Sequence, residues 1–198
     1  RQMCIRDSIE GVVSAFNIEG SLGYAGVGSE LVIFDLEEGE GLIQISSIQL
    51  PSAIQDIQVV DDYAYLALGE SGLWIVDVSE ISTPKKVGTY AVPGFSNVLD
   101  FYQEHIYLAT QSMGLWVIDV TTPTTPLKVG SFEFATQIRD VILMNGIGYV
   151  ATTAWNGESF VGDSGVYVMD VSQPSALREI DFFDTNDAPA KQLSIEGD

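Results

Sequence analysis

The chain has 198 residues, of which 46% are hydrophobic and 18% are charged, a composition typical of a folded protein with a buried core. Its 28 acidic and 8 basic residues give a net charge of −20, which argues against nucleic acid and anionic membranes as partners. No apolar run approaches the roughly 18 residues of a membrane-spanning helix, so we expect no membrane insertion.

The first eight residues, "RQMCIRDS", have no apolar signal-peptide core and no counterpart in the rest of the sequence. We interpret residues 1–8 as a non-native leader or read-through segment, with the true N-terminus missing, and residues 9–198 as a single domain. The only cysteine, Cys4, lies in this segment, and one thiol forms neither an internal disulfide nor a zinc site.

A strand-like segment that ends in aspartate occurs four times in the remaining sequence. The aspartates are spaced 42, 42 and 51 residues apart, and a tyrosine upstream of each is spaced 41, 42 and 42 apart. The four segments are "LVIFD" at 31–35, "LWIVD" at 73–77, "LWVID" at 115–119 and "VYVMD" at 166–170. The last unit is longer because the loop between its tyrosine and its aspartate has grown by nine residues.

Each unit is predicted to contain four short strands, because runs rich in Val, Ile, Tyr and Phe alternate with Gly, Asn, Ser, Thr and Pro clusters. The third strand is apolar at successive positions, which indicates burial of both its faces. Four-stranded antiparallel units repeated every 42 residues or so predict the blades of a β-propeller. We expect an incomplete, open arc of four blades plus one orphan strand. The predicted blades span about 11–52, 53–94, 95–135 and 136–186, and the next begins at 187–198.

The repeated aspartates are interpreted as structural residues of the turn between the third and fourth strands. A carboxylate there accepts backbone N–H groups of the turn, whereas a shared metal site is disfavoured because the blades hold these residues apart. They are Asp35, Asp77, Asp119 and Asp170.

An aromatic residue recurs within the third strand, as Trp74, Trp116 and Tyr167. Packing between neighbouring blades is the favoured interpretation, and an aromatic ligand platform is the alternative.

The segments "LWIVDVSEISTPKKVG" and "LWVIDVTTPTTPLKVG", with "YLALGESG" and "YLATQSMG" before them, resemble the LVIVD-repeat family. In weaker form the resemblance covers residues 11–198, and the first copy departs from it at "DLEEGEGLIQI". The resemblance implies a β-propeller of a bacterial or archaeal exported or cell-surface protein. It also implies that the first strand of each unit lines a central channel.

Three aspartates fall in these first strands, Asp56, Asp100 and Asp140. They either bind a cation, for which calcium suits all-oxygen ligands, or accept backbone N–H groups of adjacent blades, which we favour. The grown loop "TAWNGESFVGDSG" contains residues able to stack on a sugar or coordinate a cation. These candidate ligand-binding residues are Trp155, Asn156, Glu158 and Asp163.

No catalytic motif is present, and the single histidine, His105, has no partner at motif spacing. The leading hypothesis is a non-enzymatic interaction or ligand-binding scaffold at the cell surface, with a protein or carbohydrate partner. The alternative is a metal-dependent, hydrolase-like propeller enzyme whose catalytic residues lie partly in further blades.

Overall fold

A computed structural model describes residues 12–36, 42–111, 114–154, 164–185, 188 and 190–194. These residues form strands and turns, and no helix occurs among them, which confirms the all-β prediction. The leader assigned to residues 1–8 lies outside the described residues.

The strands form four antiparallel sheets, and each sheet contains four strands that follow one another in the chain. The first sheet contains β1 (Val13–Glu19), β2 (Leu22–Val27), β3 (Glu30–Asp35) and β4 (Ile43–Gln49). The second contains β5 (Asp56–Val60), β6 (Tyr63–Ala67), β7 (Leu73–Asp77) and β8 (Lys85–Tyr90). The third contains β9 (Ser96–Tyr102), β10 (His105–Thr110), β11 (Gly114–Asp119) and β12 (Leu127–Phe132). The fourth contains β13 (Gln137–Met144), β14 (Ile147–Thr153), β15 (Gly165–Asp170) and β16 (Arg178–Asp184).

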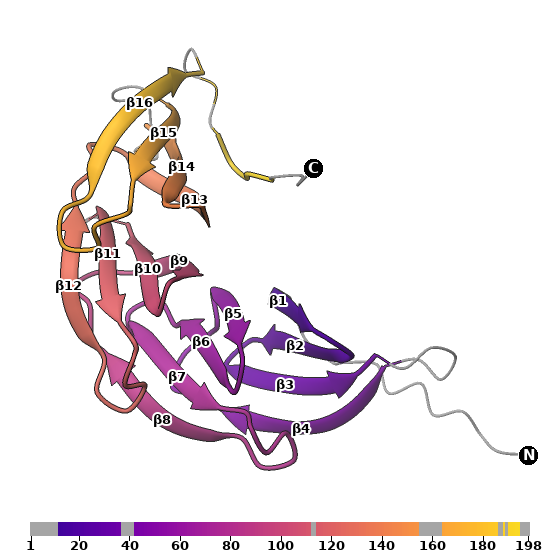
Figure 1. The fold of residues 1–198 in the computed structure, drawn as a ribbon. Helices are drawn as coiled ribbons and strands as arrows, with labels where there is room; N and C mark the ends of the chain where they lie inside the picture. Colours follow the sequence, from indigo (N-terminus) through magenta and orange to yellow (C-terminus); the bar gives the residue numbers. More distant parts are fainter. Residues whose placement is uncertain are drawn as a thin grey trace, which may run out of the picture.

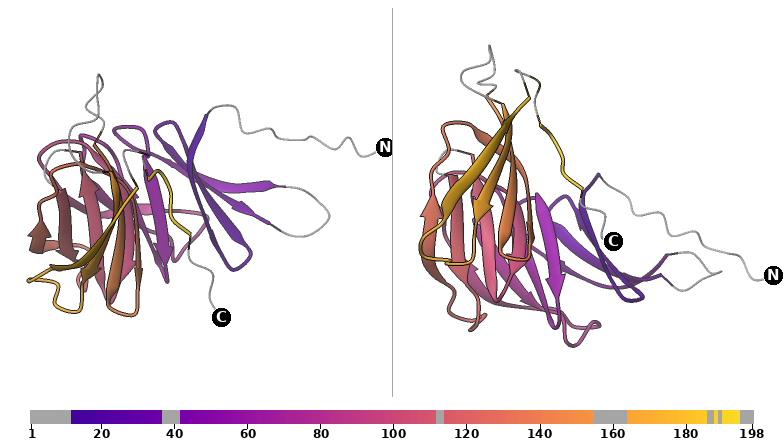
Figure 2. Two further views of the ribbon diagram at one scale, coloured as in Figure 1. Left: turned by 90° about the horizontal axis from the view of Figure 1, so that it is seen from above. Right: turned by 45° about the horizontal axis from the view of Figure 1, so that its top comes forward.

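The four sheets are the blades of an open β-propeller arc (Figure 1). The first strand of each blade lies on the inner side of the arc and the fourth strand on the outer side (Figures 1 and 2). The first and last blades stand at the two ends and do not pair, which confirms the expected open arrangement.

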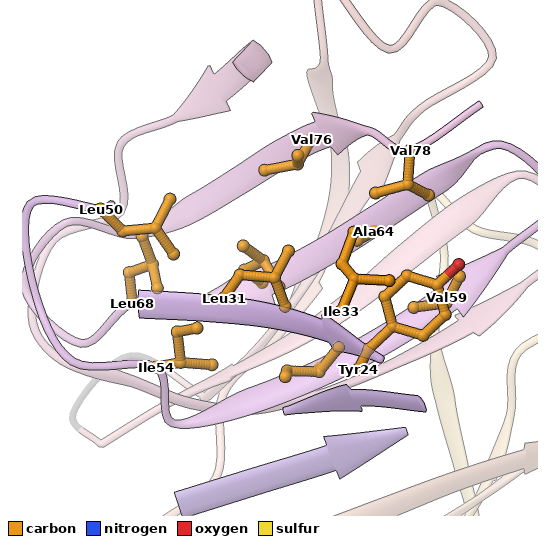
Figure 3. Packing of buried hydrophobic residues seen from close by; sticks show 12 residues of the cluster. Tyr24, Leu31, Ile33, Leu50, Ile54, Val59, Ala64, Leu68, Val76 and Val78 are labelled. Carbon is orange, nitrogen blue, oxygen red and sulfur yellow. The ribbon is translucent and has the colours of Figure 1, made fainter. Parts of the chain in front are cut away.

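Buried aliphatic residues fill the space between successive blades. Leu31 and Ile33 of β3 pack against Ala64 of β6 and Val76 of β7, as Figure 3 shows for the first and second blades. Equivalent clusters join the second blade to the third and the third to the fourth. Burying one such side chain contributes about 1.5–3 kcal/mol, so stacking of the repeats is the main stabilising interaction.

A glycine of the fourth strand allows the outer edges of the second and third blades to approach the next blade closely. A Cβ atom at Gly88 would lie 2.0 Å from the carbonyl oxygen of Pro123, and one at Gly130 would lie 2.0 Å from that of Pro174. The repeated Val-Gly pair and the proline of the following turn are therefore two sides of one contact.

Candidate functional site

The repeated aspartates at the ends of the third strands are bound within their own turns. Oδ1 of Asp77 accepts the backbone N–H of Ser79 at 3.0 Å and its hydroxyl at 2.6 Å. Asp119 binds Thr121 in the same way. These hydrogen bonds stabilise the ionised form and lower the pKa of both carboxyl groups.

The fourth blade has the same turn. Oδ1 of Asp170 accepts the N–H and hydroxyl of Ser172, and Oδ2 lies 2.6 Å from Nη2 of Arg178. These contacts lower the pKa of Asp170 to about 2. Asp35 ends β3 at the equivalent position, and the turn after it, residues 37–41, lies outside the described residues.

The channel aspartates, Asp56, Asp100 and Asp140, each connect the first strand of a blade to a residue further along the chain. One oxygen of each accepts the N–H of the following residue, at 2.8–2.9 Å. The other accepts a backbone N–H further along the chain: Leu99 for Asp56 at 2.9 Å, Leu143 for Asp100 at 2.7 Å, and Leu193 for Asp140 at 2.7 Å. Asp56 and Asp100 thus satisfy N–H groups on the inner edge of the next sheet, and Asp140 binds a residue that follows the fourth blade.

The channel aspartates are not at one level of the arc. Asp56 lies opposite Ala67 and Asp140 opposite Ala151, whereas Asp100 lies opposite Tyr107, two residues nearer the turn. Burial is the largest effect on Asp56 and Asp100 and raises the pKa of each to about 6. Within the described ranges no group of three or more His, Cys, Asp or Glu side chains is arranged to hold a metal ion. Binding of calcium by these residues stays an untested alternative to the backbone role.

The grown loop falls outside the described residues, which stop at Ala154 and resume at Ser164. These two flanking residues are held together, because Oγ of Ser164 accepts the N–H of Ala154 at 3.1 Å. The ligand-binding role of the loop stays a prediction. Its four candidate residues, all in the undescribed range, are Trp155, Asn156, Glu158 and Asp163.

The aromatic residues of the third strands pack between blades. Trp116 contacts the cluster between the second and third blades and lies edge-on to Tyr90. Its outer face is covered by the Lys128 ammonium group, 3.7 Å from the ring centroid. Lys86 covers Trp74 in the same way at 4.7 Å, and Tyr167 contacts Phe134 and Phe182. These half-buried rings contact neighbouring side chains, as expected for packing rather than for a ligand platform.

An open cleft of about 690 Å³ lies between the second and third blades, at the end where the first strand of each turns into the second. We call it the turn-side cleft. Three carboxylates and three aromatic rings contribute to its lining: Asp61, Asp62, Glu104, Tyr63, Tyr65 and Phe101. A second cleft, of about 590 Å³, lies at the opposite ends of the strands and includes Glu70, Phe95 and Gln111.

Two tight turns position the carboxylates of the turn-side cleft. Asp61 and Asp62 connect β5 to β6, and Gln103 and Glu104 connect β9 to β10. Asp61, Gln103 and Glu104 have positive φ angles of 51°, 46° and 62°, the left-handed conformation that two-residue hairpins require. The turns hold the three side chains exposed at the rim while the strands place the rings below them.

The rings form the floor of the cleft. Tyr65 is 4% exposed and stacks on Phe101, with ring centroids 5.6 Å apart. Burial, followed by the charges of Tyr63, Asp61 and Glu104, raises the pKa of the Tyr65 hydroxyl to about 12. The cleft therefore combines an apolar base with a negative rim.

Sequence profiles support the architecture described above. The profile of the LVIVD repeat matches residues 53–92, 98–133 and 159–185, together just over half of the chain. The chain belongs to the LVIVD repeat family. No curated protein matches this LVIVD-repeat chain.

Solved structures share its fold at low sequence identity. The computationally designed Ika4 protein has a TM-score of 0.66 at 10% identity, covering 84% of this chain and 95% of Ika4. The designed Ika8 protein has the same TM-score and identity, with 96% of this chain and 67% of Ika8 covered. The β-propeller domain of Cps50 (Swd1) from Myceliophteria thermophila has a TM-score of 0.66 at 14% identity, with coverages of 86% and 58%. These similarities establish the propeller fold alone.

Sequence reasoning missed the turn-side cleft, although a signal for it was present. The inner turns of the first and fourth blades are Gly20-Ser21 and Asn145-Gly146, which are common hairpin residues. The turns Asp61-Asp62 and Gln103-Glu104 place acids where the structure demands a left-handed conformation. Acidic residues occur in the turn between the first and second strands of the second and third blades only. They indicated a local feature of these two blades that is not required by the repeated fold.

Proposed function

We propose that this LVIVD-repeat chain is a non-enzymatic binding scaffold of an exported or cell-surface protein. The observation that carries this proposal is the turn-side cleft, whose carboxylates and rings belong to two blades and whose carboxylates are not part of the repeat. The stacked blades provide a rigid support, and loops and turns on such a support commonly carry binding residues.

The remaining titratable groups of the site support binding rather than catalysis. The channel and turn aspartates accept backbone and hydroxyl hydrogen bonds, and His105 is bonded through Nδ1 to the carbonyl of Gln103, at 2.6 Å. A catalytic base must be able to reach a substrate proton, and these groups are engaged by their own turns and strands. The exported location rests on the family, and no membrane-spanning helix is present in the part of the chain that the structure describes.

An array of cell-surface polysaccharides and extracellular protein domains tests the proposal. The wild-type chain is compared with Asp62→Arg, which adds bulk at the cleft rim and reverses one of its three charges, and with Glu80→Arg, an equal charge change outside the cleft lining. We expect a ligand that wild type and Glu80→Arg retain and Asp62→Arg loses. Turnover of ester, phosphoester or glycoside substrates by the purified chain, or retention by all three proteins, would contradict the proposal.

A further inference from the structure

The Tyr65 hydroxyl is free where its counterpart in the next blade is bound. Tyr107 occupies the same place in β10 and donates its hydroxyl hydrogen to the carbonyl of Val171, at 3.2 Å. Tyr65 is 4% exposed and lines the turn-side cleft, yet its hydroxyl has no hydrogen-bond partner among the described residues. The Tyr65 side chain is buried, but its hydroxyl oxygen is open to the cleft, where a ligand can form the hydrogen bond that the protein does not supply.

The charges around this hydroxyl are negative only. Asp61, Asp62 and Glu104 are exposed at the rim, and no lysine, arginine or histidine is among the described residues that line the cleft. These carboxylates are not grouped as metal ligands within the described ranges. The walls are aromatic, and stacked rings attract organic cations by their negative faces.

We propose that the turn-side cleft binds the arginine side chain of a partner polypeptide, with the guanidinium between Tyr65, Phe101 and the rim carboxylates. This inference deepens the proposed function and rests on it. Arginine fits better than a compact cation, because its planar group stacks on rings and donates paired hydrogen bonds to carboxylates. A cleft of about 690 Å³ has room for the side chain and the adjoining peptide backbone.

Binding is measured with a blocked, fluorescent pentapeptide, Gly-Ala-Arg-Ala-Gly, by fluorescence anisotropy at about 0.15 M salt, where long-range charge attraction is screened. The same peptide with citrulline in place of arginine has nearly the same shape and no charge. The double variant Asp61→Asn and Glu104→Gln neutralises two of the three rim carboxylates. The matched control, Glu133→Gln and Glu179→Gln, removes two exposed acids outside the cleft lining.

We expect saturable binding of the arginine peptide and at least about tenfold weaker binding of the citrulline peptide, since charge-assisted hydrogen bonds are lost. The rim variant should weaken binding by about tenfold and the control by less than about twofold. Tyr65→Phe should weaken it by several fold without changing the unfolding midpoint.

Equal losses in the rim variant and the control would show general attraction to a chain of charge −20 and would overturn the inference. Equal binding of both peptides, or none at all, would also overturn it. A glycan or protein from the array that binds elsewhere on the chain would leave the proposed function standing, so the two failures are distinguishable.

Discussion

Lowering the pH from about 7.5 to about 4.5 should stabilise the blades through Asp56 and Asp100. Burial raises the pKa of each carboxyl group from 3.8 to about 6, although backbone hydrogen bonds from the adjacent blade oppose this effect. Each group binds its proton more tightly in the folded than in the unfolded chain. Its contribution to stability is therefore complete below pH 3.8 and is lost as the pH rises through about 6.

The size of the effect follows from the two pKa values. Ionising a carboxyl group whose pKa rises from 3.8 to about 6 on folding costs the folded state about 3 kcal/mol. Lowering the pH from about 7.5 to about 4.5 removes about 2 kcal/mol of this cost for each group, because the carboxyl group becomes protonated in the folded chain. Asp77, Asp119 and Asp170 have lowered pKa values and lose their contribution as the pH falls below 3.8 toward those values. This window therefore separates their effect from that of Asp56 and Asp100.

Urea unfolding at several pH values measures this contribution. Asp100→Asn keeps the shape of the side chain without a titrating proton, so its free energy of unfolding should gain about 2 kcal/mol less than wild type across the window. Glu133→Gln removes an exposed acid and should retain the wild-type pH dependence. Parallel curves for wild type and Asp100→Asn would refute the reasoning.

Three further outcomes follow from the packing. Gly130→Ala places a Cβ 2.0 Å from the Pro174 carbonyl oxygen and should lower the free energy of unfolding by about 1–3 kcal/mol. The exposed control Ser131→Ala should change it by less than about 0.5 kcal/mol, and equal effects of the two substitutions would contradict the contact. In urea unfolding, Tyr107→Phe should lower the free energy of unfolding by about 1 kcal/mol and Tyr65→Phe should leave it nearly unchanged. A larger loss for Tyr65→Phe would contradict the hydrogen bonds described. Calcium should leave the melting temperature unchanged, because the channel aspartates already accept backbone N–H groups; a calcium-dependent rise would show that an ion site exists.

The blades could be predicted because the information that defines them is local and repeated. Strand runs such as "LWIVD" and "LWVID", tight turns and a period of 42 residues each require only a short stretch of sequence. Burial of both faces of the third strand followed from its successive apolar residues, and Leu115, Val117 and Ile118 of β11 are all fully buried.

The sequence already implied that the three channel aspartates lie at different levels of the arc, although the prediction did not include this. Asp56 and Asp140 precede the repeated tyrosine by nine residues and Asp100 by seven, so equal levels were excluded by counting. The turn-side cleft is different in kind, because it depends on which side chains of two blades meet. A tyrosine recurs in every blade, and only packing determines that the hydroxyl of Tyr107 meets a carbonyl oxygen while that of Tyr65 does not.

Amide chemical-shift mapping with the arginine pentapeptide tests the central claim, that the turn-side cleft is the binding site, most directly. The backbone amides of the 198-residue chain are followed during the titration, with the citrulline peptide as reference. The account predicts saturable changes confined to the amides of residues 60–65, 101–104 and 120–122, all close to the cleft. Changes scattered over the acidic surface, or concentrated in another blade, would contradict it.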